Sequence, residues 1–302
     1  MDYSAIGKKI RELRKGVGLT QGELAEGICT QALVSRMEKG DIYPSAAALY
    51  QISVKLGVDV NYFFEIGTTP RLDYVLEVEK QLKRLRVNFK FDEILELVKT
   101  EEKNPLFYND PEKLQLLYWY KGIYAFEVEK DEEAAFSLLN EAFFLTAGQK
   151  KARTEREMEI LLSIGTIHSS LHQHDKALDY YDQIESSLKA TEQLYDKTIK
   201  PRLFYNIARV LTRLEKYGES TDYCKKALNW CIEEELLWGL GELNYQIGYN
   251  YELVHEMEKA VLYFNRALHM FELRGNEKNV TFLNEKISRL LNGGTGGQVP
   301  CP

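Results

Sequence analysis

The sequence predicts an all-α protein, and two observations carry this prediction. The first 66 residues contain short apolar patterns with helical spacing, each bounded by capping residues or glycines. Residues 72–291 have helical periodicity almost throughout, are rich in Leu and Tyr, and are interrupted only by short breaks. With 44% hydrophobic and 28% charged residues the composition is that of a globular chain, and a length of 302 residues favours two domains.

Five short helices are predicted in the N-terminal segment. Thr20 begins the second of them as an N-cap, with Glu23 three residues later in the capping-box pattern. Thr30 caps the third helix, and Gly40 ends it. The expected segments are residues 4–15, 21–28, 31–39, 45–56 and 60–65.

The second and third predicted helices are joined by a turn of about three residues, which makes a helix-turn-helix. In this motif the first helix braces across the DNA backbone and the second lies in the major groove. Gln31 and Arg36 can make bidentate bonds to adenine and guanine, each worth about 1–3 kcal/mol of discrimination. Gln21 and Lys39 are better placed for phosphates. The predicted DNA-binding residues are Gln21, Thr30, Gln31, Ala32, Ser35, Arg36 and Lys39.

The charge of the chain is unevenly distributed. Residues 1–69 carry eight Lys/Arg and eight Asp/Glu, so the net charge of −7 belongs to the rest of the chain. Lys8, Lys9, Arg11, Arg14 and Lys15 crowd into the first predicted helix, and such local clustering favours contact with phosphates. The pattern "LTQGELAEGI", a short turn and "VSRMEKGDIYPS" closely resembles the phage-repressor-like (XRE or Cro/C1-type) DNA-binding domain.

No apolar run approaches the roughly 20 residues that a membrane-spanning helix needs, and the N-terminus lacks the apolar region of a secretory signal. We therefore expect a cytoplasmic protein without a membrane partner. The four cysteines, Cys29, Cys224, Cys231 and Cys301, lack zinc-ligand spacing and are expected to be thiols in a reducing compartment.

A spacing of small residues recurs along the larger segment. In its clearest copy, Gly248 is followed 12 residues later by Ala260, and then by Phe264 and Ala267. Three earlier copies keep the same offsets, and successive starts lie 43, 43 and 40 residues apart. They comprise Ala208, Ser220, Cys224 and Ala227; Gly165, Ala177, Tyr181 and Ile184; and Gly122, Ala134, Leu138 and Glu141.

This pattern resembles the tetratricopeptide repeat, in which small residues let two helices approach closely and larger ones fill the interface with the next pair. Together with a weaker copy over residues 72–102, it predicts a right-handed superhelix of about five helical hairpins. The main alternative is a coiled coil, and the absence of a sustained heptad in the sequence argues against it.

Stacked helical pairs present the first helix of each pair on a concave face, which is a groove for a peptide or a partner helix. We expect groove-facing residues two before and one after each small residue, together with their neighbours. Amides suit a peptide because they donate to a backbone carbonyl and accept from a backbone N–H. The alternative interpretation is that these residues are simply polar positions that face solvent. The candidates are Ser163, Thr166, Tyr205, Asn206, Arg209, Gln246 and Tyr249.

The whole arrangement resembles the RNPP group of Gram-positive quorum-sensing regulators, from Ile6 to Leu290. The resemblance rests on "GLTQGELAEGICTQALVSRMEKGDIYPS", "YNIARVL" followed by "YGES", "LNYQIGY" and "NEKISRL". It implies a homodimer on a palindromic double-stranded DNA operator, with a short signalling peptide in the repeat groove that alters how the two DNA-reading heads are held.

The resemblance also implies roles for single residues. Asn206 and Gln246 match the family's peptide-contacting amides, and Lys90 falls near a basic position that meets an acidic peptide. Where the family has another Asn, this chain has Thr166 or a neighbour, which indicates a different signal peptide. The predicted domains are residues 1–66, the DNA-binding head; 67–86, a linker and first repeat helix; 87–291, the peptide-binding and dimerisation domain; and 292–302, a flexible tail carrying Cys301.

No catalytic constellation, cofactor or metal is expected. His168, His172 and His174 suggest metal ligands by type, but no further ligand has an obvious reason to converge on them, so solvated or capping histidines are the better interpretation. The stretch "GGTGGQ" lacks the Lys and the strand-to-helix context of a phosphate loop. The alternative function is a tetratricopeptide scaffold that binds a protein, or a protein that sequesters a response regulator.

Overall fold

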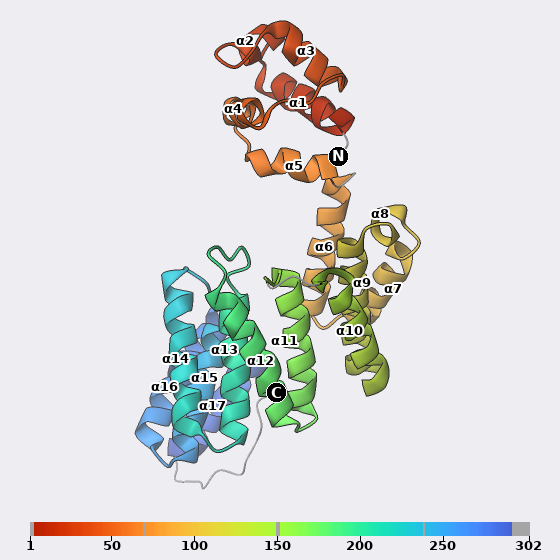
Figure 1. Cartoon of the computed structure of the whole chain (residues 1–302). Helices are drawn as coiled ribbons and strands as arrows, with labels where there is room; N and C mark the ends of the chain where they lie inside the picture. Colours follow the sequence, from red (N-terminus) through yellow and green to blue (C-terminus); the bar gives the residue numbers. More distant parts are fainter. Residues whose placement is uncertain (1–2, 69–70, 149–151, 238, 292–302) are drawn as a thin grey trace. The chain divides into compact units, whose positions relative to one another are not determined.

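The computed structural model describes residues 3–68, 71–148, 152–237 and 239–291, and within these ranges every regular element is a helix, as predicted (Figure 1). The predicted tail 292–302, with Cys301, lies outside the described residues. The chain divides into two compact units, residues 1–114 and 115–302, which are described separately. In the described part of the chain no helix is both long enough and apolar enough to cross a membrane.

The N-terminal head consists of α1 (Tyr3–Val17), α2 (Gln21–Ala25), α3 (Gln31–Lys39), α4 (Ala46–Leu56) and α5 (Val60–Thr68). The predicted caps are confirmed. The Thr20 hydroxyl accepts from the N–H of Glu23 (3.2 Å), and the Glu23 carboxylate accepts from the N–H of Thr20 (2.6 Å). The hydroxyls of Thr30 and Ser45 accept from the N–H groups of Leu33 and Ala48 and so cap α3 and α4, and a left-handed glycine follows each of these two helices.

In the head, α1 and α3 pack very closely. A Cβ atom on Gly7 would lie 2.1 Å from the backbone oxygen of Met37, so only glycine allows the two helices to come this near. The core below them is apolar and fully enclosed, with Ile10, Leu24 and Val34 all at 0% exposure. This core fixes which face of α3 points outward.

After the head, α6 (Leu72–Val87) and α7 (Phe91–Glu101) form a helical hairpin, as the weak first repeat predicts. A short helix, α8 (Pro105–Tyr108), precedes α9 (Pro111–Tyr124), and α9 crosses the division between the two units.

The second unit continues with paired helices. Successive helices pack against one another along the chain, and α17 packs on α16. The helices are α10 (Glu132–Ala147), α11 (Glu155–Ser170), α12 (His174–Lys189), α13 (Ile199–Arg213), α14 (Tyr217–Glu233), α15 (Leu240–Leu253), α16 (Met257–Leu273) and α17 (Glu277–Leu291).

The predicted small-residue spacing is confirmed in the last three pairs. A Cβ atom on Gly165 would lie 2.4 Å from the ring of Tyr181, and one on Gly248 would lie 2.8 Å from the ring of Phe264. In the pair between them, the Ser220 hydroxyl donates to the backbone oxygen of Ala208 (2.8 Å). Burial raises the pKa of Tyr181 to about 12, so its phenol is neutral at physiological pH.

The predicted register of the pair formed by α9 and α10 is wrong by one residue. A Cβ atom on Gly122 would meet Leu139 (2.7 Å) and the backbone oxygen of Ala135 (3.3 Å), and Ala142 completes the buried row. The prediction named Ala134, Leu138 and Glu141 instead.

The cause of the shift is a π-helical turn, η1 (Ala125–Glu129), at the end of α9. There the N–H of Asp131 bonds the carbonyl oxygen six residues earlier, that of Ala125, whereas the N–H of Gln173 bonds His168, five residues earlier. The extra residue moves the next helix by one position. With it, the α9/α10 pair has the same Ala, large apolar, Ala order as the last pair.

The two cysteines of the second unit that lie in the described residues are packing residues. Cys224 and Cys231 are both at 0% exposure. Burial raises the pKa of both thiols above the usual range, that of Cys231 to about 11, so they are protonated at neutral pH. Cys29, in the head, is a partly exposed free thiol.

Candidate nucleic-acid interface and groove pocket

The outward face of α3 carries the predicted reading side chains. Val34 and Met37 point into the core, so the opposite side of the helix faces solvent. On it Gln31, Ala32, Arg36 and Lys39 are exposed, Ser35 is half-buried, and Thr30 is the exposed N-cap residue. Within the described residues neither Arg36 nor Lys39 has an ion-pair partner, so both cations are available to an anion from outside the chain.

A buried ionic cluster holds α3 against α1 and α2. Arg14 Nε and Nη2 donate to the two carboxylate oxygens of Glu38 (2.5 and 3.0 Å), and Arg14 Nη1 donates to the carbonyl of Leu19 (2.7 Å). Gln21 Nε2 donates to Glu38 Oε2 (2.8 Å). Arg14 is 8% exposed and Glu38 is 5% exposed. We call Arg14, Glu38 and Gln21 the head network.

The head network changes the pKa of its carboxylate. Burial by itself raises the pKa of Glu38, but the hydrogen bonds from Arg14 and Gln21 and the charge of Arg14 outweigh it and hold the pKa below its usual value. Glu38 is therefore ionised at neutral pH, and the cluster is a true ion pair.

One member of the predicted basic cluster is not available to DNA. Arg14 was expected to contribute to phosphate contact, and this expectation is wrong because its guanidinium is buried against Glu38. Lys9 pairs with Glu12 (3.2 Å). Gln21 lies at the start of α2 as predicted, with its amide engaged by Glu38.

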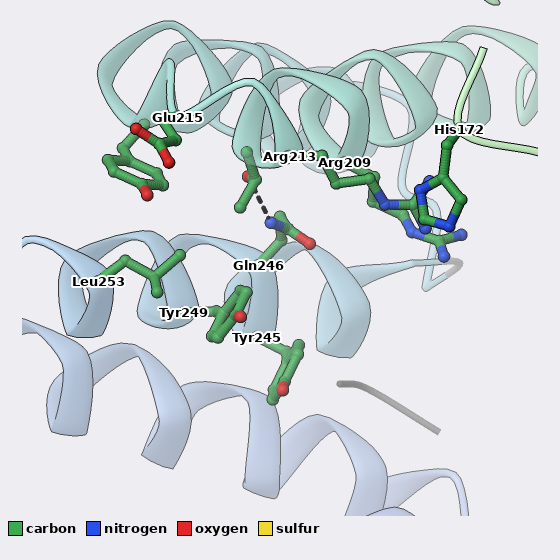
Figure 2. Close-up of a pocket in the computed structure, with 10 residues that line it drawn as sticks. His172, Arg209, Arg213, Glu215, Tyr245, Gln246, Tyr249 and Leu253 are labelled. Atoms are coloured by element: carbon green, nitrogen blue, oxygen red, sulfur yellow. Dashed lines mark hydrogen bonds between the residues drawn. The ribbon is translucent and has the colours of Figure 1, made fainter. Parts of the chain in front are cut away.

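A pocket of about 520 Å³ lies between α13 and α15 in the second unit (Figure 2). These are the first helices of two consecutive pairs, which are the helices expected to form the groove. The lining residues are His172, Arg209, Thr212, Arg213, Glu215, Tyr217, Tyr245, Gln246, Tyr249 and Leu253. Three of them, Arg209, Gln246 and Tyr249, are among the predicted peptide-binding residues.

Beneath the pocket a cluster of neutral polar side chains ties α13, α14 and α15 together. Gln246 Nε2 donates to Thr212 Oγ1 (2.8 Å), and Thr212 Oγ1 donates to Asn250 Oδ1 (2.6 Å). Asn250 Nδ2 donates to Ser220 Oγ (2.8 Å) and to Thr221 Oγ1 (3.1 Å). All five side chains are buried. We call Thr212, Ser220, Thr221, Gln246 and Asn250 the groove network.

The other predicted peptide residues have varied surroundings. Asn206 is half-buried on α13, and its amide has no hydrogen-bond partner in the described part of the chain. Tyr205 lies under Arg209, whose guanidinium carbon is 5.8 Å from the ring centre. Ser163 accepts from Trp119 Nε1 (2.9 Å), and Thr166 donates to the carbonyl of Leu162 in its own helix (2.8 Å).

Lys90 belongs to the other compact unit. Its ammonium group donates to Glu93 Oε1 (2.6 Å), an exposed pair within one turn of α7.

Several residues that line the pocket were not among those predicted from the sequence. Thr212 and Arg213 follow Arg209 by one helical turn, and Tyr245 and Leu253 flank Tyr249 in the same way, so helical periodicity extended by one turn finds them. His172 and Glu215 are different, because they are turn residues with φ of 58° and 61° that no periodicity predicts.

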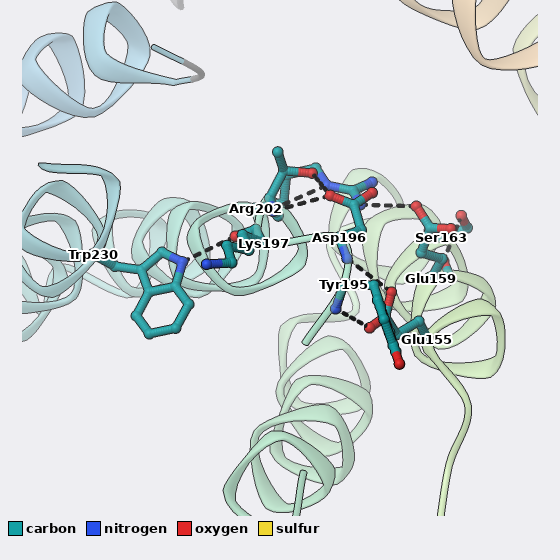
Figure 3. A network of polar contacts seen from close by, with 9 residues as sticks. Glu155, Glu159, Ser163, Tyr195, Asp196, Lys197, Arg202 and Trp230 are labelled. Carbon is teal, nitrogen blue, oxygen red and sulfur yellow. Dashed lines mark hydrogen bonds and ion pairs between the residues drawn. The ribbon is translucent and has the colours of Figure 1, made fainter. Parts of the chain in front are cut away.

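The loop between α12 and α13 helps to fix α11 and α13, which are the first helices of two neighbouring pairs (Figure 3). The carboxylate of Glu155 on α11 accepts from the N–H groups of Tyr195 (2.6 Å) and Asp196 (2.9 Å). Arg202 on α13 pairs with Glu159 on α11 (2.8 Å). These bonds hold α11 and α13 side by side, so the groove-facing helices keep their spacing.

His168 is a packing residue. The His168 ring stacks between Phe136 and Tyr180, with centre distances of 4.5 and 5.4 Å, and its Nδ1 bonds Gln173 Oε1 (2.8 Å). Burial lowers the pKa of His168. Among the described residues no group of three or more His, Cys, Asp or Glu side chains is arranged to hold a metal ion.

Comparison with known proteins finds two matching families. The model described as the RNPP family C-terminal domain matches residues 79–292, and a helix-turn-helix model matches residues 10–63. A comparison with curated proteins finds no significant match.

Among solved structures, the chain is similar to PlcR from Bacillus thuringiensis in complex with the peptide PapR7 and DNA, with 25% identity and a TM-score of 0.83 over 93% of this chain and 99% of that one. It has the fold of ComR from S. thermophilus in complex with DNA and the signalling peptide ComS, with 17% identity and a TM-score of 0.65 over 94% and 99% of the two chains. The pheromone receptor Rgg2 from Streptococcus dysgalactiae has the same fold, with 16% identity and a TM-score of 0.63 over 94% and 99%.

Proposed function

The chain belongs to the RNPP family of transcription regulators, and from that premise we propose that it is a DNA-binding regulator whose operator affinity responds to a short signalling peptide. The observation that carries the DNA-binding part is the outward face of α3, where Gln31, Arg36 and Lys39 are exposed and held from below by the head network. In the proposal α3 lies in the major groove, with Gln31 and Arg36 at base edges and Lys39 at a phosphate.

A single small head covers one half-site, so the proposal includes a homodimer on a palindromic operator. The two heads must be spaced by about 34 Å or a multiple of it to read the same face of the duplex. Peptide bound in the pocket between α13 and α15 alters that spacing through its preference for one arrangement of the repeats, and a coupling of about 1–3 kcal/mol is enough for a usable switch. Because the proposed operator is DNA inside the cell, the proposal places the protein in the cytoplasm.

Selection of binding sequences from random DNA duplexes by the full chain tests the DNA-binding part. Wild-type protein is expected to enrich a palindrome. Arg36→Ala is expected to lose preference at one position in each half-site, and Lys39→Ala to weaken binding to all sequences alike. Arg84→Ala, an exposed arginine on α6 outside the helix-turn-helix, is the matched control and is expected to behave as wild type. Enrichment of no sequence by wild-type protein contradicts the proposal.

The peptide part is tested separately by calorimetry on the full chain. The probe is the C-terminal heptapeptide of any secreted precursor encoded by a small reading frame beside this gene. Saturable binding that Gln246→Ala or Tyr249→Ala weakens supports the proposal. A groove saturated by a protein partner, and by no peptide, supports a protein-binding scaffold instead.

A further inference from the structure

The pocket between α13 and α15 has two chemically different ends. Arg209, Arg213 and His172 gather at one end, and Glu215 lies at the other (Figure 2). Between these ends the pocket is lined by Tyr245, Gln246 and Tyr249.

The two arginines carry like charges that no acidic side chain of the described residues pairs with. Within the described residues neither Arg209 nor Arg213 forms an ion pair, and burial together with the like charge of Arg209 lowers the pKa of Arg213 from its usual value. Arg213 Nη1 donates to the carbonyl and to the hydroxyl of Ser169, both at 2.8 Å, so one edge of its guanidinium is fixed. The group stays protonated at physiological pH, so an anion bound between the two guanidinium groups would relieve their repulsion.

Gln246 determines which kind of hydrogen bond the same site can offer a ligand. Its Nε2 is committed to Thr212 and lies close to Asn250, and its oxygen points away from Thr212 (Figure 2). The amide can therefore accept a hydrogen bond from a ligand, but its donor side is already used within the groove network. A backbone N–H of a peptide is the matching donor.

From these contacts we infer that the arginine end of the pocket binds a carboxylate of the signalling peptide, while Gln246 accepts a peptide N–H and an apolar or aromatic side chain packs on Tyr245 and Tyr249. A planar guanidinium bonds a carboxylate through two parallel N–H groups, which gives orientation as well as affinity. The inference rests on the proposed function and specifies its ligand as an acidic peptide. The carboxylate is either the C-terminus or an Asp or Glu side chain.

Three pools of N-acetylated synthetic heptapeptides separate these sources. The first pool has a free C-terminus and no Asp or Glu, the second has an amidated C-terminus and one Asp or Glu, and the third is amidated without acidic residues. Each pool is passed over the immobilised full chain, and retained peptides are quantified by mass spectrometry. We expect the first or the second pool to be retained at least about tenfold more than the third, as charge-assisted pairing predicts.

Two variants connect this preference to the arginines. Arg209→Gln changes an exposed side chain without a hydrogen bond in the described structure, so it is expected to fold normally and to reduce the preference for carboxylate. Arg209→Gln combined with Arg213→Gln is expected to abolish it, with thermal melting as the check on folding. Arg266→Gln, an exposed arginine on α16, is the matched control and keeps the preference.

Equal retention of the three pools by wild-type protein overturns the inference and leaves peptide binding intact. A carboxylate preference that survives in the folded double variant also overturns it. Retention of no pool contradicts peptide binding itself, and with it the proposed function.

Discussion

The head and the groove are both supported by a buried polar network, but the two networks differ in chemistry and in consequence. The head network is an ion pair, Arg14 with Glu38, and it leaves the reading face of α3 free. The groove network is neutral, and one of its members, Gln246, is itself part of the candidate binding surface. A ligand at α3 therefore meets Arg36 and Lys39, which have no ion-pair partner within the described residues, whereas a ligand in the groove meets an amide already bonded into a network that joins three helices.

The largest effect is expected from breaking the head network. Glu38→Ala leaves the buried guanidinium of Arg14 without its carboxylate, which typically costs about 3–5 kcal/mol. Hydrogen exchange on the full chain, read separately for peptides from α1–α3 and from α13–α15, is expected to show faster exchange in the head alone. Loss of protection in both regions would show that the head network is not local.

A second substitution disrupts the contact between α1 and α3. Gly7→Ala places a Cβ atom against the backbone oxygen of Met37, and such overpacking typically costs about 1–3 kcal/mol or more where backbone must move. Gly16→Ala is the matched control in the same helix, since a Cβ atom there meets nothing within 4 Å, and it is expected to stabilise by about 0.5–1 kcal/mol. Chemical denaturation followed by the same exchange readout checks both, and similar effects of the two substitutions would contradict the packing account.

The groove network is expected to be less costly to break, because it contains no charge. Asn250→Ala removes one member and leaves hydroxyl and amide groups unsatisfied, at a cost of about 1–3 kcal/mol. Exchange is expected to increase in α13–α15 and not in the head. Gly218→Ala on α14, where a Cβ atom has open space, serves as the neutral control. If Asn250→Ala increases exchange no more than Gly218→Ala does, the role of the network is contradicted.

The smallest expected difference is in pH dependence. The pKa of Glu38 is held below its ordinary value of 4.5, so the ion pair contributes stability above that value and loses it as the pH falls through the lower pKa of the folded state. Limited pepsin digestion between pH 5 and about pH 2 is expected to cut α1–α3 progressively in wild-type protein. The corresponding pH dependence is expected to be weaker in Glu38→Gln, and Asn250→Ala is expected to leave it unchanged. Parallel profiles in wild type and Glu38→Gln contradict the assignment.

The same contrast explains what the sequence could predict. Thr20, Glu23 and Thr30 act on neighbours within three residues, so local pattern was enough to place α2 and α3 and their exposed faces. The register of the α9/α10 pair depended on the π-helical turn at Ala125–Glu129, which adds a residue without any change in hydrophobic period.

Contacts between helices were the other feature that the sequence did not predict. The burial of Arg14 and the engagement of Gln246 depend on partners 24 and 34 residues away, Glu38 and Thr212, and no spacing rule for a single helix contains that information. Local pattern therefore predicted which side chains of one helix are exposed, but it did not predict which side chains are bonded between helices.

The central claim is that a ligand in the groove alters what α3 binds. It is tested most directly by titrating a heptapeptide that calorimetry shows to bind the groove into full-length protein bound to its selected palindrome, with operator affinity as the measurement. The account predicts that the peptide tightens operator binding by about 5- to 150-fold, the range of a coupling of about 1–3 kcal/mol, and that Arg209→Gln reduces the effect. An operator affinity that stays constant across the peptide titration, while calorimetry shows the groove to be saturated, would contradict it.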